Sequence, residues 1–184
     1  MRPTFRLIVG FATFALALGT AYCVAHLEAS EQTPTVAVAA LERLLPAAPA
    51  GWSKGEAKTE QVVISSDCSH PIAVVTFTQG ETRVKISLAD SGMHPDSLMA
   101  LAPMLVMLPE GYSERIPPAT KIERMQRNGV QVAERWDERK GDAEITMLVK
   151  GRFVLSGEGR HLDSLDTLRA MLDAIDLRKL VELK

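Results

Sequence analysis

The chain has 184 residues, of which 46% are hydrophobic and 24% are charged, and its formal net charge is −2. This composition is typical of a folded globular protein and excludes a disordered or fibrous chain, and the length suits one domain with a substantial core. The small negative charge provides no attraction for polyanions, so we expect no nucleic-acid partner.

Residues 1–25 carry the pattern of an export signal. Arg2 and Arg6 precede an apolar run over residues 7–25, and the small residue Ala25 allows cleavage after it. The sequence therefore predicts a periplasmic or secreted protein with a cleaved signal peptide. The alternative is a single-pass membrane anchor with the domain outside the cytoplasm, because the apolar run nearly reaches the about 20 residues that span a bilayer.

The polar residues 26–33 predict a linker, and residues 34–184 predict a single domain. Thr33 and the proline that follows it match the N-cap and the first position of a helix, which we expect to extend to about residue 45. Pro46 ends this helix, because proline lacks the backbone N–H that a helix interior needs.

A hairpin and a second helix are predicted next. Residues 72–78 and 83–88 are rich in strand formers, and Gly80 suits the tight turn between them. Asp96 or Ser97 can cap the next helix, which contains Pro103, so we expect a kink or two short helices.

Residues 126–160 predict a meander of antiparallel strands. Asn128 and Gly129 form the dipeptide that a type I′ hairpin turn favours, because both residues tolerate positive φ. Glu134 interrupts the apolar face of the strand that follows. It is either a buried carboxylate or a residue that a strand edge or bulge turns to solvent, and we expect the second arrangement.

The last helix begins at Asp163 or Ser164 and has an apolar stripe that must be buried. The stripe consists of Leu165, Leu168, Leu172 and Ile175. We expect Ile145 and Met147 of the meander to pack against this stripe. Thr146 alternates with them, so it is expected on a solvated face.

The order of elements predicts an α+β fold with a single antiparallel sheet of about six or seven strands and helices packed on it. Together with the export signal, this outline resembles the secreted domains of the Mog1/PsbP-like type. The resemblance covers residues 34–184 and implies the same fold class. It matches no motif residue, so it implies no site residue and no activity.

Cys68, His70 and His94 are candidate metal ligands. Cys68 and His70 lie two positions apart, which places both side chains on one side of an extended segment, where a thiolate and an imidazole can bind a soft metal. After signal cleavage Cys68 is the single cysteine, and a buried structural thiol is the alternative. The nearby methionines Met99 and Met107 are expected to fill gaps in the core.

No catalytic residue is predicted, because the sequence contains none of the motifs of serine hydrolases, zinc proteases or nucleotide-binding enzymes. Arg152, Arg160 and His161 suit an anion near the last helix, although solvated charge is the simpler interpretation. The sequence thus favours an exported non-catalytic binding or accessory protein without a cofactor, with a protein or small-molecule partner. The alternative function is a small metal- or thiol-dependent periplasmic protein.

Overall fold

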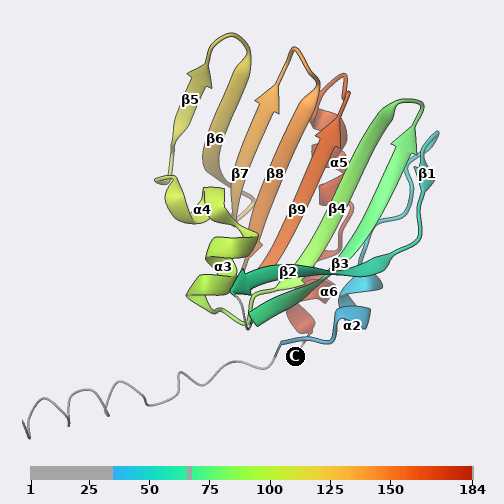
Figure 1. Ribbon diagram of the computed structural model, residues 1–184, viewed down its shortest axis with the longest axis vertical. Helices are drawn as coiled ribbons and strands as arrows, with labels where there is room; N and C mark the ends of the chain where they lie inside the picture. Colours follow the sequence, from blue (N-terminus) through green and yellow to red (C-terminus); the bar gives the residue numbers. More distant parts are fainter. Residues whose placement is uncertain (1–34, 66–67, 184) are drawn as a thin grey trace, which may run out of the picture. The chain divides into compact units, whose positions relative to one another are not determined.

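Nine strands form a single sheet in the computed structural model, which describes residues 35–65 and 68–183 (Figure 1). The strands are β1 (Ser53–Lys54), β2 (Lys58–Ser65), β3 (Cys68–Gln79), β4 (Thr82–Asp90), β5 (Ser113–Ile116), β6 (Thr120–Arg127), β7 (Val130–Asp137), β8 (Asp142–Val149) and β9 (Phe153–Arg160). The described helices are α2 (Val38–Glu42), α3 (Pro95–Leu101), α4 (Pro103–Met107), α5 (Leu165–Asp173) and α6 (Leu177–Glu182).

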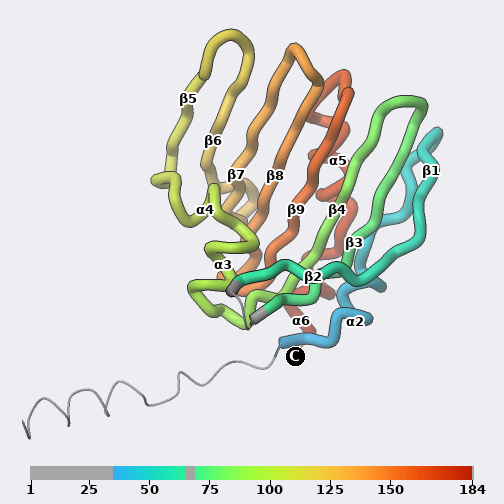
Figure 2. The backbone as a smooth tube through the Cα atoms, viewed as in Figure 1, coloured from blue at the N-terminus to red at the C-terminus, as the bar shows by residue number. Residues whose placement is uncertain are grey.

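The sheet is open, and its strand pairs are antiparallel, as predicted, although it has more strands than expected. Its order is β1-β3-β4-β9-β8-β7-β6-β5, and β2 pairs with β3 outside this path. The pairing of β4 with β9 joins two segments far apart in sequence, which run side by side in Figure 2. The meander β6 to β9 therefore continues into the hairpin β3–β4 without a break.

One face of the sheet is covered by α2, α5 and α6. Leu168 and Leu172 of α5 belong to the same buried cluster as Ile145 and Met147 of β8, which confirms the predicted packing. Gly157 of β9 lets the helix come this close, because a Cβ atom there would lie 2.8 Å from Cδ1 of Leu168. In Figure 1 α5 accordingly lies behind the strands.

The opposite face is covered at one end only, by α3, α4 and β2. Leu101 and Leu105 pack there with Val154 of β9 in an apolar cluster, and α3 also packs on β2. Thr146, which alternates with the core residues of β8, is therefore buried, with 2% of its surface exposed. The expectation of a solvated position was wrong because the helices between β4 and β5 cover this end of the face.

Several local predictions are confirmed. Asn128 and Gly129 both have positive φ in the β6–β7 turn. The predicted interruption at Pro103 separates α3 from α4. Ser164 caps α5, its hydroxyl accepting a hydrogen bond from the N–H of Asp166. The first helix is shorter than expected, because α2 covers only residues 38–42.

The predicted export segment and linker, residues 1–33, lie outside the described residues. No helix among the described residues is long and apolar enough to cross a membrane.

The packing of α5 on β8 and β9 predicts a large stability loss for Leu168→Ala. The side chain is fully buried, so its truncation should lower the free energy of unfolding by about 2–5 kcal/mol through lost burial and a cavity. Val181→Ala on α6 is the control, because Val181 is 39% exposed and its truncation should cost at most about 0.5 kcal/mol. Urea titration measures both, and equal small losses would contradict this packing.

Candidate functional site

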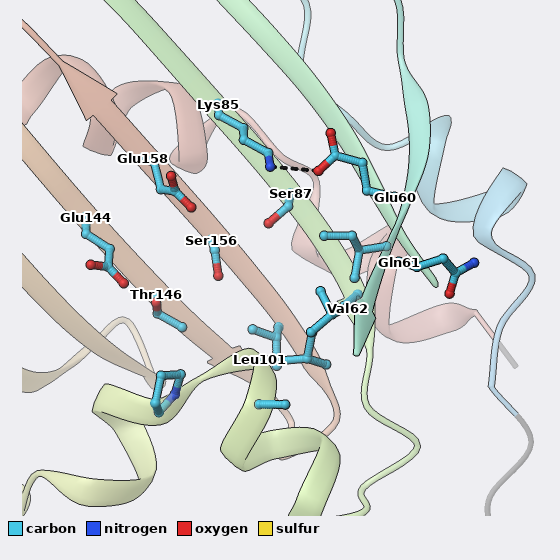
Figure 3. Close-up of a pocket in the computed structure, with 15 residues that line it drawn as sticks. Glu60, Gln61, Val62, Lys85, Ser87, Leu101, Glu144, Thr146, Ser156 and Glu158 are labelled. Carbon is cyan, nitrogen blue, oxygen red and sulfur yellow. Dashed lines mark hydrogen bonds and ion pairs between the residues drawn. The ribbon is translucent and has the colours of Figure 1, made fainter. Parts of the chain in front are cut away.

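A cleft of about 270 Å³ lies on the partly covered face of the sheet, between β2, α3 and the strands β4, β9 and β8. Figure 3 shows Lys85, Ser87, Ser156 and Thr146 on the strands, with Val62 of β2 and Leu101 of α3 beside them, whereas Gln61 of β2 points away. The cleft is bounded by Leu101 of α3 at one end and by Glu60 and Lys85 near the other. It therefore begins where the cover provided by α3 ends.

Directly paired residues of neighbouring strands lie on the same face of the sheet. The register of β4, β9 and β8 therefore arranges the side chains of the face that carries the cleft in three rows. The charged row consists of Lys85, Glu158 and Glu144. The hydroxyl row consists of Ser87, Ser156 and Thr146. The apolar row consists of Ala89, Val154 and Leu148, next to the helices. The lining thus changes from charged to apolar over three rows.

Most charges of the cleft are paired. Lys85 Nζ lies 2.7 Å from Glu60 Oε2, and hydrogen bonds from Lys85 and then from Lys58 hold the pKa of Glu60 below its ordinary value. Arg135 Nη2 lies 2.9 Å from Glu144 Oε2.

Glu158 differs from these residues. Its carboxylate forms no hydrogen bond or ion pair with any described residue, and in register it lies directly between Lys85 and Glu144. Across strands, opposite charges in directly opposite positions attract and like charges repel, so Lys85 and Glu144 act on Glu158 in opposite senses. Because Glu60 also pairs with Lys58, at 2.9 Å, the acidic and basic side chains around the opening balance, and Glu158 is the carboxylate among them that forms no direct pair with a described residue.

The hydroxyl of Thr146 also lacks a partner among the described residues, although the residue is almost entirely buried. No fully enclosed polar side-chain atom is without a partner in this part of the chain, so the hydroxyl must open onto the cleft. The hydroxyls of Ser87 and Ser156 beside it are likewise unpaired within the described residues. Buried hydroxyls normally have partners, and along this row the partners can be water or the polar groups of a ligand.

A second hollow, of about 310 Å³, lies on the other face beside Trp136 and the start of α5. At its base Glu134 is buried and forms ion pairs with Arg169 and, at 3.4 Å, with Arg127 Nη1. The hydrogen bonds that Arg169 donates to Glu134 raise the pKa of Arg169, which keeps the guanidinium charged.

The expectation that a bulge or a strand edge turns Glu134 to solvent was wrong. The register of β7 is regular there, and Glu134 faces α5, where Arg169 compensates its charge. The buried carboxylate thus links α5 to the sheet. Because it is fully paired, we assign it a structural role.

A third polar cluster anchors the start of the domain. Asp90 is 1% exposed and accepts hydrogen bonds from Arg152 Nε at 2.8 Å and from the backbone N–H of Val36 at 2.7 Å. Burial alone raises the pKa of Asp90, but the hydrogen bonds from Arg152 and from backbone N–H groups outweigh it, so this pKa lies below its ordinary value. The Nε2 of His70 donates to the carbonyl oxygen of Asp90.

The candidate anion residues are not brought together. Arg152 lies at one end of β9 and is paired with Asp90, whereas Arg160 ends the strand at the other. His161 is exposed beside Arg160, and its Nδ1 lies 3.4 Å from the carbonyl oxygen of Glu81.

Of the candidate metal ligands, His70 is buried in the Asp90 cluster. His94 lies in the loop before α3, and its Nδ1 is 4.0 Å from Oδ2 of Asp96. Among the described residues no three His, Cys, Asp or Glu side chains lie close enough to hold a metal ion. The side chain of Cys68 lies outside the description, so a metal site with Cys68 stays a prediction.

The methionines of α3 and α4 correct another expectation. Met107 is 72% exposed and Met99 is 46% exposed, so neither fills a gap in the core. Leu101 and Leu105 provide the contacts of these helices with the sheet instead. The helices are too short for the apolar spacing to indicate which side faces the sheet.

The sequence does not identify the cleft residues as a site, because polar and apolar residues alternate in these strands as they do in any strand with one solvated face. The signal that could have found them is the alignment of hydroxyl residues on three strands. That alignment requires the register between β4 and β9, which no local pattern provides.

Asp90→Asn should lower the free energy of unfolding at neutral pH by about 3 kcal/mol, because it leaves the guanidinium of Arg152 without its buried counter-ion. The pKa of Asp90 is lowered in the folded state, so its contribution is complete above the ordinary aspartate pKa of about 4 and is lost as the pH falls through the lowered value. The difference between wild type and variant should therefore shrink in acid.

Urea titrations of both proteins at pH 7 and at decreasing acid pH measure this difference. Asp96→Asn, at an exposed carboxylate, is the control and should change little at any pH. A difference for Asp90→Asn that is constant down to the lowest pH would contradict the role of this ion pair.

Comparison of the chain with protein-family models, with curated proteins and with solved structures finds no match. The chemistry of the cleft is therefore the basis on which a function can be assigned.

Proposed function

We propose that the protein is an exported, non-catalytic binding protein that holds a small molecule in the cleft between β2, α3 and the sheet. The observation that carries this proposal is the hydroxyl row of Ser87, Ser156 and Thr146, whose side chains open onto the cleft without a partner among the described residues. A ligand with polar groups provides the missing hydrogen bonds.

The size and lining of the cleft support a small ligand. Its volume of about 270 Å³ is just below the range of about 300–1,000 Å³ that holds for pockets of drug-sized ligands. Such pockets combine apolar surface with a few convergent polar groups, and the cleft has Val154 and Leu101 on one side and the hydroxyl row on the other. A peptide or a large cofactor would exceed this space.

The arrangement of the hydroxyls supports binding over covalent catalysis. A nucleophilic hydroxyl is activated by an adjacent general base. Among the described residues, none of the three hydroxyls is hydrogen-bonded to a histidine or a carboxylate.

The export part of the proposal rests on Arg2, Arg6 and the apolar run over residues 7–25. Mass spectrometry of the intact protein from the exported fraction tests it. A mature chain that begins near His26 is expected. A chain that begins at Met1 and stays with the membranes would contradict cleavage and support the anchored alternative.

Binding in the cleft is tested by a thermal-unfolding screen of the full protein against a library of small metabolites. At least one should raise the melting temperature in a concentration-dependent way, because a ligand that binds the folded state stabilises it. Combining Thr146→Val with Ser156→Ala should abolish this shift.

Thr78→Val is the matched control, because Thr78 is an exposed threonine of β3 that does not line the cleft. This variant should keep the ligand-dependent shift. The proposal fails if no metabolite stabilises the protein, or if the cleft variant and the control respond alike.

A further inference from the structure

We infer that the cleft binds an uncharged small molecule that carries hydroxyl groups on one side and hydrocarbon on the other, such as a short diol or a cyclic polyol. The inference rests on the proposed function, since it names the class of ligand for the same cleft. Three features of the lining support it: the balance of charges at the opening, the uncharged rows further in and the order of these rows.

The charges at the opening of the cleft favour neither a cation nor an anion. Glu60 Oε1 lies 2.9 Å from Lys58 Nζ, and Glu60 Oε2 lies 2.7 Å from Lys85 Nζ. Glu158 forms no direct pair with a described residue, but it lies in register between Lys85 and Glu144, which act on it in opposite senses. A charged ligand would therefore gain no net attraction from this row.

The two rows further in are uncharged. The hydroxyl row consists of Ser87, Ser156 and Thr146, and the row beyond it is apolar. A charged group against the hydroxyl row would lose hydration without a counter-ion, which costs more free energy than hydrogen bonds to neutral hydroxyls provide. A ligand hydroxyl has less hydration to lose. It also both donates and accepts, as the side chains of this row do, so each can pair with the other in either direction.

The order of the rows sets the orientation of the ligand. Residues two positions apart on a strand are about 7 Å apart, so the apolar row lies that far from the hydroxyl row. Val62 of β2, Leu101 of α3 and Val154 of β9 border this apolar end. Hydrocarbon on one side of the ligand would contact these side chains while its hydroxyls face the hydroxyl row. The volume of about 270 Å³ equals that of about nine water molecules, which suits a small substituted ring.

The test uses three cyclohexane rings that each carry one hydroxyl group and, on the next ring carbon but one, a second group of different charge. The probes are cyclohexanediol, aminocyclohexanol, which is a cation at neutral pH, and hydroxycyclohexane carboxylate, which is an anion. Each is titrated into the full protein while the backbone amide signals are followed by NMR.

The diol should shift the amides of Thr146 and Ser156 in a saturable way. Its dissociation constant should be about tenfold or more below those of both charged rings, because their charged groups lose hydration in the cleft. Diol binding should also be equal at low and high salt, since salt screens interactions between charges.

Thr146→Val should weaken diol binding about fivefold, because it removes one hydrogen bond between uncharged groups and keeps the shape of the side chain. Thr78→Val, at the exposed threonine of β3 outside the cleft, is the control and should bind the diol like wild type. Glu158→Gln should leave diol binding unchanged, because the ligand has no charge. This carboxylate is exposed, so the variant should fold normally.

The inference is overturned if either charged ring binds in the cleft as tightly as the diol, if Glu158→Gln weakens diol binding, or if Thr146→Val binds the diol like the control. If no ring binds, the metabolite found in the thermal screen decides: an uncharged one with hydroxyl groups supports the inference, and any other overturns it. None of these results contradicts the proposed function, which the screen tests separately. If neither the rings nor any metabolite binds, the inference and the proposed function are both wrong.

Discussion

The structure depends on how unequally the two faces of its sheet are covered. Nine strands present two broad faces, and the described helices are short. Three of them, α2, α5 and α6, bury one face in a continuous core. The remaining pair, α3 and α4, covers only one end of the other face, together with β2. The cleft lies at the border of this partial cover, where the buried Thr146 hydroxyl has no partner among the described residues.

Two ion pairs with buried carboxylates hold elements of the fold in position. Glu134 and Arg169 link the sheet to α5, while Asp90 and Arg152 link β4 to the start of β9 and to Val36. Buried ion pairs add little net stability, but losing one partner is costly because a buried charge remains. These ion pairs therefore fix the positions of the strands and of α5 more than they stabilise the fold. A preorganised cleft requires that the elements around it keep their positions.

Features set by neighbouring residues could be predicted from the sequence. The Asn128–Gly129 turn, the break at Pro103 and the buried stripe with Leu168 each follow from a local pattern. Glu134 and Thr146 were misplaced because their surroundings depend on which distant helix covers each face.

The cleft could not be predicted for the same reason. Its rows of side chains form only when β4 pairs with β9, and its enclosure requires α3 and β2. Polar alternation in a single strand is the same for a solvated face and for a binding site. The contact of His70 with the carbonyl oxygen of Asp90 likewise joins residues 20 positions apart.

The central claim is that the cleft is the ligand site of the molecule. Crystals of the protein soaked with a library of small fragments test it most directly, because each bound fragment reports its own position. The account predicts that fragments gather in the cleft, with polar atoms within hydrogen-bond distance of the Thr146 hydroxyl. Fragments that gather in the hollow beside Trp136 while the cleft stays empty would contradict it.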